Sequence, residues 1–141
     1  MRSVRTVAYE LPVELVLSPD VSVPMYVALR YEAHDPYAVR AVFRPPGRDE
    51  TVEWFFGREM LAQALSGRTG PGGDVDMWPA VDAGRATVFV GLRSPAGSAL
   101  VAFPARDVES FLRETWSAVP PGSEADRLDL DAELSELLTG N

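Results

Sequence analysis

The sequence predicts an α+β fold of about seven mostly antiparallel strands, arranged in two meanders, with three helices. Short strand patterns follow one another in two groups, and each group ends in a helical pattern. Strands and helices therefore do not alternate one by one, as they would in a doubly wound parallel sheet. We expect helices on one side or end of the sheet, and a single domain over residues 1–141, a length that suits one hydrophobic core.

The first half of the chain contains four strand patterns and a short helix. The strands are rich in β-branched and aromatic residues and are separated by turns that contain proline. Gly57 is expected to cap the helix, and Gly67 to end it. Because Phe55 and Phe56 are both apolar, the sequence predicts that both faces of the sheet are covered here. The predicted strands are residues 4–17, 25–32, 37–43 and 50–56, and the helix covers 58–65.

The second half repeats this arrangement with three strands and two helices. A helix is predicted to open at Pro104 and to run to Val119, because apolar residues recur there at helical spacing. A last helix over about 129–138 has a stripe of leucines and an acidic opposite face. The predicted strands are residues 74–79, 85–93 and 98–103.

Composition excludes several classes of protein. The 46% hydrophobic and 24% charged residues are typical of a globular domain. A net charge of −8, with arginine as the sole basic residue besides His34, repels a polyanion, so we expect no nucleic-acid partner. The absence of cysteine excludes disulfides and thiol catalysis. No apolar run approaches the roughly 20 residues of a membrane span, and Glu10, Pro12 and Glu14 interrupt any signal peptide, so a cytoplasmic protein is expected.

The residues that could carry chemistry are few. His34 stands beside Asp35 and could act as a general base, but a surface histidine at a proline turn is the favoured interpretation. Asp74 and Asp76 share a strand face, yet they lack a third carboxylate or an imidazole to complete a cation site. The glycines at 70–73 lack the lysine and hydroxyl residue of a phosphate loop. The sequence therefore predicts no catalytic residue, no cofactor and no metal site, and a protein that is not an enzyme.

Aromatic and arginine residues are concentrated on the predicted strands. They could form a base-stacking platform for single-stranded nucleic acid, but core aromatics with surface arginines fit the negative charge better. The apolar strands exceed what few helices can cover, which favours a homo-oligomer. For Trp54 and Phe56, an intramolecular core role is the alternative to an interface. The candidate partner or subunit contacts are Tyr37, Trp54, Phe56, Arg58, Trp78 and Pro79.

Five strings of residues identify a family resemblance. In this order, they resemble the SsgA-like proteins of sporulating actinomycetes, and the SsgB branch most closely, over about residues 11–138. The strings are LRYEAHDPYAVRAVF, TVEWFFGREMLAQAL, GGDVDMWP, LRSPAGSALVAFPARDVESFLRETWSAVPPGSE and LDLDAELSELL.

This resemblance implies a non-enzymatic developmental protein of cell division. Such a protein helps to recruit or position the tubulin-like protein FtsZ at sporulation septa, so the implied location is the cytoplasm at the division septum. Its implied partners are FtsZ and other SsgA-like or division proteins, and its implied fold is similar to the whirly-type single-strand-binding proteins, with a trimeric assembly. A single-stranded nucleic-acid-binding protein of that fold is the alternative function. A small hydrolase would need an organised pocket around His34.

Overall fold

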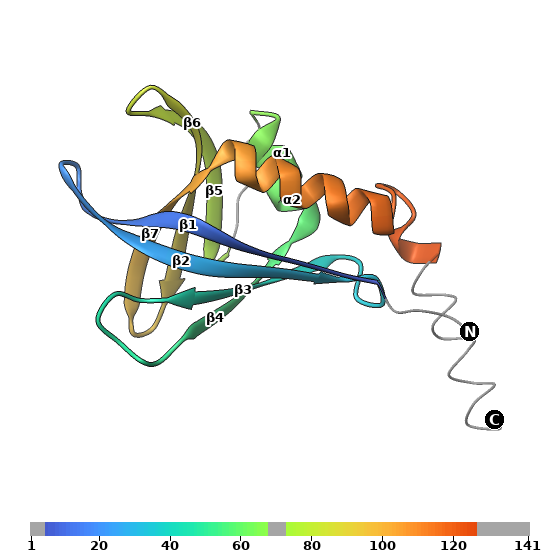
Figure 1. Cartoon of the computed structure of the whole chain (residues 1–141), viewed down its shortest axis with the longest axis horizontal. Coiled ribbons are helices and arrows are strands. Elements are labelled where there is room, and N and C mark those ends of the chain that lie inside the picture. Colours follow the sequence, from blue (N-terminus) through green and yellow to red (C-terminus); the bar gives the residue numbers. More distant parts are fainter. Residues whose placement is uncertain (1–4, 68–72, 127–141) are drawn as a thin grey trace.

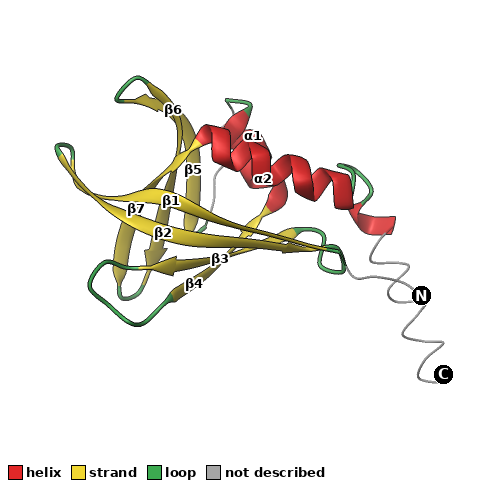
Figure 2. Cartoon of the chain, in the orientation of Figure 1, coloured by secondary structure: helices red, strands yellow, loops and turns green. Residues whose placement is uncertain are grey.

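The computed structural model describes residues 5–67 and 73–126. Seven antiparallel strands form one curled sheet in the order β4-β3-β2-β1-β7-β6-β5, and two helices lie on one side of it (Figure 1; coloured by element type in Figure 2). The predicted α+β fold is confirmed. The third predicted helix, 129–138, lies outside the described residues, although residues 124–126 form a helical turn.

The first four strands form one meander. Its elements are β1 (Thr6–Ser18), β2 (Val21–Glu32), β3 (Ala38–Arg44) and β4 (Val52–Gly57), which leads directly into α1 (Arg58–Leu65). The predicted break between the strands at 4–17 and 25–32 is too long, because Ser22 and Pro24 pair with Val16 and Glu14 of β1. Proline cannot donate a backbone hydrogen bond, and it is tolerated in a strand where no neighbouring strand needs one. The described pairing of β2 with β3 ends at Tyr26 and Arg44, so no β3 residue lies opposite Pro24.

The last three strands form the second meander. Its elements are β5 (Val75–Asp82), β6 (Arg85–Ser94) and β7 (Gly97–Pro104), followed by α2 (Ala105–Ala118). A two-residue turn joins β5 to β6, and both of its residues, Ala83 and Gly84, have positive φ angles of 51° and 77°. This backbone conformation matches the twist of a tight hairpin. With the turn at these two residues, β5 stays paired with β6 up to Asp82, and so runs past Pro79, where the sequence predicted its end.

The two meanders meet along a short seam between β1 and β7. Their register pairs Glu14 with Ala102 and Leu15 with Val101, whereas β1 and β2 pair over nearly their whole length. Strands that pair so briefly diverge at both ends, and the sheet curls around α2 (Figure 1). Side-chain packing, rather than backbone pairing, must therefore hold the two halves together.

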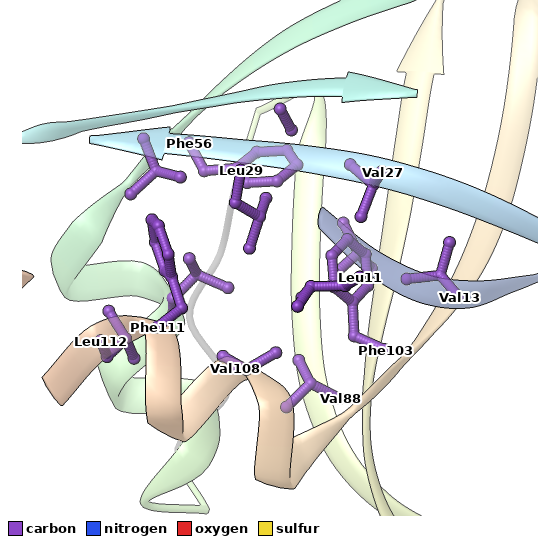
Figure 3. Packing of buried hydrophobic residues seen from close by; sticks show 14 of the residues in the cluster. Leu11, Val13, Val27, Leu29, Phe56, Val88, Phe103, Val108, Phe111 and Leu112 are labelled. Carbon is purple, nitrogen blue, oxygen red and sulfur yellow. The ribbon is translucent and has the colours of Figure 1, made fainter. Parts of the chain in front are cut away.

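The hydrophobic core fills the space between the curled sheet and the helices. Alternate residues of each strand point into it, and α2 contributes Val108, Phe111 and Leu112 (Figure 3). The Phe111 ring meets Tyr9 of β1 edge-to-face, with centroids 5.6 Å apart. Because α2 contacts β1, β6 and β7, its apolar face bridges both meanders.

Two details of the first half separate prediction from structure. Gly57 caps α1, and the predicted bounds of that helix, 58–65, are confirmed. However, Phe55 is 56% exposed, so the prediction that both faces of the sheet are covered at this point is wrong. Phe56 faces the core and Phe55 faces away from it, because successive side chains of a strand point to opposite faces. In the second half, Pro104 precedes α2 as its N-cap rather than opening it.

Replacing Phe111 with alanine should reduce the free energy of unfolding by about 3–5 kcal/mol, because a fully buried ring is lost and a cavity remains. Ser110→Ala on the exposed face of α2 is the control and should change stability by less than about 0.5 kcal/mol. Urea unfolding measures both. A loss below about 1 kcal/mol for Phe111→Ala would show that α2 does not anchor the core.

Candidate partner-binding surface

The side of the first meander that faces away from α2 is called here the outer face. Its side chains alternate with the core residues along each strand, so the sheet itself sets their spacing. No described helix covers this face (Figure 1). The outer face consists of Ala8, Glu10, Pro12, Tyr26, Ala28, Arg30, Glu32, Arg40, Val42, Arg44, Glu53 and Phe55.

The arginines of the outer face are paired with glutamates of the same face. Arg30 and Arg40 stand directly opposite each other on β2 and β3, a pairing that is unfavourable by itself. Each has a carboxylate beside it, since Arg30 lies 3.7 Å from Glu32 and Arg40 is hydrogen-bonded to Glu53. Arg44 likewise lies 3.7 Å from Glu10 across β2. The outer face therefore offers arginines without a concentrated positive field.

Two exposed aromatic residues, Tyr26 and Phe55, lie among these ion pairs. Phe55 stands opposite Arg40, and Tyr26 stands opposite Arg44. A small hollow of about 60 Å³ lies beside Phe55, and Arg30 and Arg40 are among its lining residues. Exposed rings next to arginines are typical of surfaces that bind other proteins.

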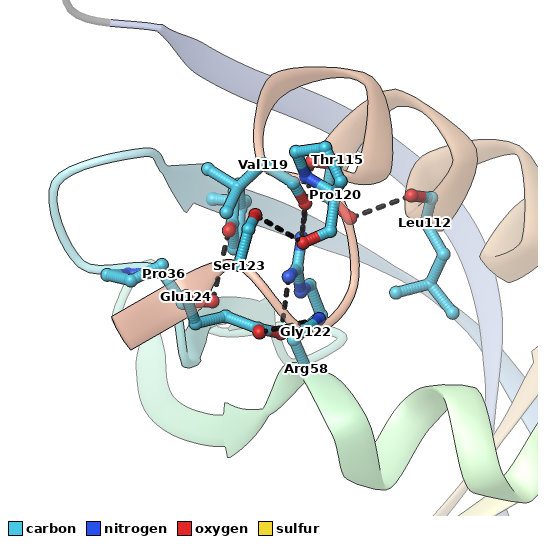
Figure 4. Close-up of polar contacts among 10 residues, drawn as sticks. Pro36, Arg58, Leu112, Thr115, Val119, Pro120, Gly122, Ser123 and Glu124 are labelled. Atoms are coloured by element: carbon cyan, nitrogen blue, oxygen red, sulfur yellow. Dashed lines mark hydrogen bonds and ion pairs between the residues drawn. The ribbon is translucent and has the colours of Figure 1, made fainter. Parts of the chain in front are cut away.

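Arg58, the first residue of α1, is buried at the edge of the core with 2% of its surface exposed (Figure 4). Its Nη1 donates hydrogen bonds to the carbonyl oxygens of Thr115 at 3.2 Å and Val119 at 2.7 Å, and its Nη2 donates to Glu124 Oε2 at 2.6 Å. The last turn of α2 contains no basic residue of its own. Arg58 thus supplies the positive charge and the donors that the carboxyl end of α2 requires.

The same guanidinium connects to the first meander. Its carbon atom lies 4.9 Å from the ring centroid of the buried Tyr31, close enough for a cation–π interaction. The Tyr31 hydroxyl donates to the carbonyl of Pro36, and the Arg58 amide donates to that of Tyr37. Through its side chain and its backbone amide, Arg58 therefore fixes the β2–β3 turn, the start of α1 and the end of α2 relative to one another.

Glu124 completes this cluster. Burial raises the pKa of its carboxyl, but the hydrogen bond and charge of Arg58, together with backbone donors that include the Gly122 amide, outweigh burial and lower the pKa below its ordinary value. Glu124 is therefore ionised at neutral pH, and it neutralises the buried Arg58.

Four of the six predicted contact residues belong to the first half of the chain. Tyr37 is 52% exposed beside α1, and Trp54 is half-buried against the core. Phe56 is buried, which fits the intramolecular alternative. The expectation that Arg58 lies on the surface is wrong, because its donors bind groups that only the folded chain brings near. Arg58→Glu would therefore test folding rather than partner binding.

The remaining two candidates lie at the opposite edge of the sheet. Trp78 and Pro79 are half-buried in β5, whereas Trp54 and Phe56 belong to β4. The Trp78 ring stacks on Phe89 of β6, with centroids 5.9 Å apart. The structure therefore does not bring the six residues together into one surface.

The candidates for chemistry are separated from one another. His34 is exposed, with its Nε2 3.8 Å from Glu32, and it lines neither of the two hollows described for this surface. Asp76 is paired with Arg93 at 2.6 Å. Within residues 5–67 and 73–126, no group of three potential metal ligands is present. A larger hollow of about 480 Å³, between the β1–β2 and β5–β6 hairpins, includes none of the six predicted contacts and is lined mainly by apolar residues.

A comparison with known protein families identifies the family of this chain. A family model described as Streptomyces sporulation and cell division protein, SsgA, matches residues 25–124. The chain belongs to the SsgA family. The matched segment runs from β2 to Glu124, and so includes the outer face of β2 to β4 and the whole Arg58 cluster.

Relatives within the SsgA family cover nearly the whole chain. Sporulation-specific cell division protein SsgB of Streptomyces coelicolor is 50% identical over 94% of this chain and 96% of its own length. The protein of the same name from Frankia casuarinae is 44% identical over 96% of this chain and 93% of its own length. The predicted resemblance to the SsgB branch is confirmed.

Two solved structures share this fold. One comes from a study of SsgB mutations that correlate with longitudinal cell division during sporulation of Streptomyces coelicolor, and it matches with a TM-score of 0.85 and 46% identity, covering 90% of this chain and 98% of that chain. The other is an SsgA-like sporulation-specific cell division protein from Thermobifida fusca, with a TM-score of 0.86 and 37% identity, covering 96% of this chain and 98% of that chain. The likeness to whirly proteins stays a prediction.

Sequence reasoning on this SsgA-family chain did not place Glu124 or Tyr26 among the candidate contact residues. Glu124 pairs with an arginine 66 residues away, and no local pattern marks such a partner. Tyr26 could have been found, because it alternates with Met25 and Val27, which face the core. No described helix of this family member is long and apolar enough to cross a membrane.

Glu124→Gln should alter how stability depends on pH. A carboxyl whose folded pKa is lowered stabilises the fold fully above its unfolded pKa, about 4.3, and loses that contribution as pH falls through the folded value. The difference in unfolding free energy between wild type and Glu124→Gln should therefore be constant from pH 7 to about 5 and should shrink in more acidic solution. Urea unfolding across this pH range measures it. A difference independent of pH down to about 2.5 would contradict the pairing.

Proposed function

We propose that this chain is a non-enzymatic adaptor that recruits or positions FtsZ at sporulation septa through protein–protein contacts. The observation that carries this proposal is membership of a family of sporulation and cell-division proteins, with relatives named sporulation-specific cell division protein SsgB that cover nearly the whole chain. An adaptor needs a stable fold with a free surface, and the outer face provides one.

The composition of the outer face supports a protein partner. Tyrosine, phenylalanine and arginine are enriched in protein interfaces, and all three are exposed here in Tyr26, Phe55 and Arg40. Because the strands hold these side chains at fixed spacing, little conformational freedom has to be lost on binding. A partner with apolar groups and hydrogen-bonding groups in alternation would fit this face.

The same face disfavours the alternative of single-stranded nucleic acid. Such a ligand needs a positively charged groove that follows its backbone. Here Arg30, Arg40 and Arg44 each lie beside a glutamate, and the whole chain carries a net charge of −8. Phosphates would have to displace these glutamates at a considerable electrostatic cost.

We further propose that the protein acts as a homotrimer on the cytoplasmic side of the septum, together with other SsgA-like or division proteins. Exposed aliphatic side chains at the hairpin tips, Leu17, Val21 and Val81, supply apolar surface for assembly. Light scattering should give a mass of about three times the 15.4 kDa chain. A monomer at micromolar concentration would contradict the trimer.

Purified protein should co-sediment with FtsZ filaments formed with GTP, and its presence should change the light scattering of polymerising FtsZ. A single-stranded oligonucleotide should show no mobility shift at low salt, because the arginines of the outer face are already paired. Absence of any effect on FtsZ, together with a salt-sensitive oligonucleotide shift, would replace the proposal with the nucleic-acid alternative.

A further inference from the structure

Strand β4 is an open edge of the sheet. It pairs with β3 on one side, and no other strand of the described chain pairs with it. The backbone groups on its other side therefore have no strand partner among the described residues, which is the arrangement that an additional strand can bind.

The two edge strands differ in how well they are protected. Strand β5, at the far edge, contains Pro79, which removes a backbone donor and discourages pairing. Strand β4 has the sequence VEWFFG and contains neither proline nor a basic residue, and its one charged side chain, Glu53, is paired with Arg40 of β3. Natural edge strands that must stay unpaired usually carry such residues, so their absence from β4 marks this edge as one that accepts a partner.

Apolar side chains are exposed on both faces of this edge. Phe55 on the outer face is 56% exposed, and Val52 on the opposite face is 42% exposed. Trp54 lies between them on the same face as Val52 and is half-buried. An extended segment laid along β4 would therefore place one of its side chains beside Phe55 and the neighbouring ones beside Val52 and Trp54.

Charge defines one end of the edge. Asp49 and Glu50 lie in the turn just before β4, and neither has an ion-pair partner among the described residues. Glu53 is already paired with Arg40, and Arg58, just after β4, is paired with Glu124. The two carboxylates outnumber the neighbouring Arg48, so net negative charge remains near the start of β4 and would attract a basic residue at the matching end of the added segment.

We propose that β4 is the docking site for FtsZ, and that it binds an extended FtsZ segment as an eighth strand of the sheet. The segment has apolar side chains on both faces and a lysine or arginine at the end that meets Asp49 and Glu50. Main-chain hydrogen bonds along the strand supply affinity, and side-chain contacts with Phe55, Val52 and Trp54 supply specificity. This inference rests on the proposed function, since it names the site through which FtsZ is recruited.

The test compares two double variants with the same change in charge. Val52→Lys with Phe55→Lys places protective lysines on both faces of β4, where both side chains are exposed and the fold should persist. Ser110→Lys with Ser117→Lys is the control, because these exposed residues lie on α2, away from β4. In co-sedimentation with FtsZ, the β4 variant should bind at least tenfold more weakly than wild type, and the control should bind within about twofold.

Hydrogen exchange on the wild-type protein gives a readout that needs no variant. On addition of FtsZ, amides of residues 52–57 should exchange more slowly, because strand addition hydrogen-bonds amides on the side of β4 that has no strand partner among the described residues, while those of 75–82 should not change.

The docking site would be overturned if the β4 variant bound FtsZ as tightly as wild type, or if FtsZ bound wild type without slowing exchange at residues 52–57. Either result would leave the adaptor function standing. A lower mass for the β4 variant in light scattering, with unchanged FtsZ binding, would assign the edge to a second copy of the chain and would also overturn it. Failure of the wild-type protein to bind FtsZ would overturn both the function and the site.

Discussion

The connection between the two meanders is the constraint on which the rest of this structure depends. Strands β1 and β7 are paired in register at only Glu14–Ala102 and Leu15–Val101, so the sheet alone holds its halves weakly. Helix α2 bridges them by packing, and Arg58 then ties the end of α2 to the start of α1 and to the β2–β3 turn. A buried arginine tolerates this position because two carbonyl oxygens and Glu124 satisfy its donors.

This arrangement separates the two faces of the sheet by role. The helices and the Arg58 cluster occupy the concave side, so the core-facing side chains are covered and cannot contact a partner. No described helix covers the outer face and no described strand pairs with the free side of β4, and these surfaces carry aromatic rings and paired charges. A stable scaffold with an exposed face and an edge strand that can still pair suits the proposed adaptor role.

Much of the fold could be predicted because local patterns determine it. Alternation placed the strands, and Gly57 with the apolar stripe of α1 placed that helix at its observed bounds. What failed required knowledge of distant neighbours. Phe55 looked buried because sequence cannot show that the outer face stays uncovered, and Arg58 looked exposed because arginine usually is. Its partners Thr115, Val119 and Glu124 lie 57 to 66 residues away, where no periodic pattern reports them.

A double-mutant cycle between Arg58 and Glu124 tests the central claim most directly. Arg58→Met, Glu124→Ala and the combined variant would be compared with wild type by urea unfolding at neutral pH. Each single change should be strongly destabilising, because removing either partner leaves the other residue with a buried charge that nothing neutralises. The two effects should therefore be coupled by more than about 1 kcal/mol. Effects that add within about 0.5 kcal/mol would show that Arg58 and Glu124 contribute independently, and would contradict the account of how the two halves are held together.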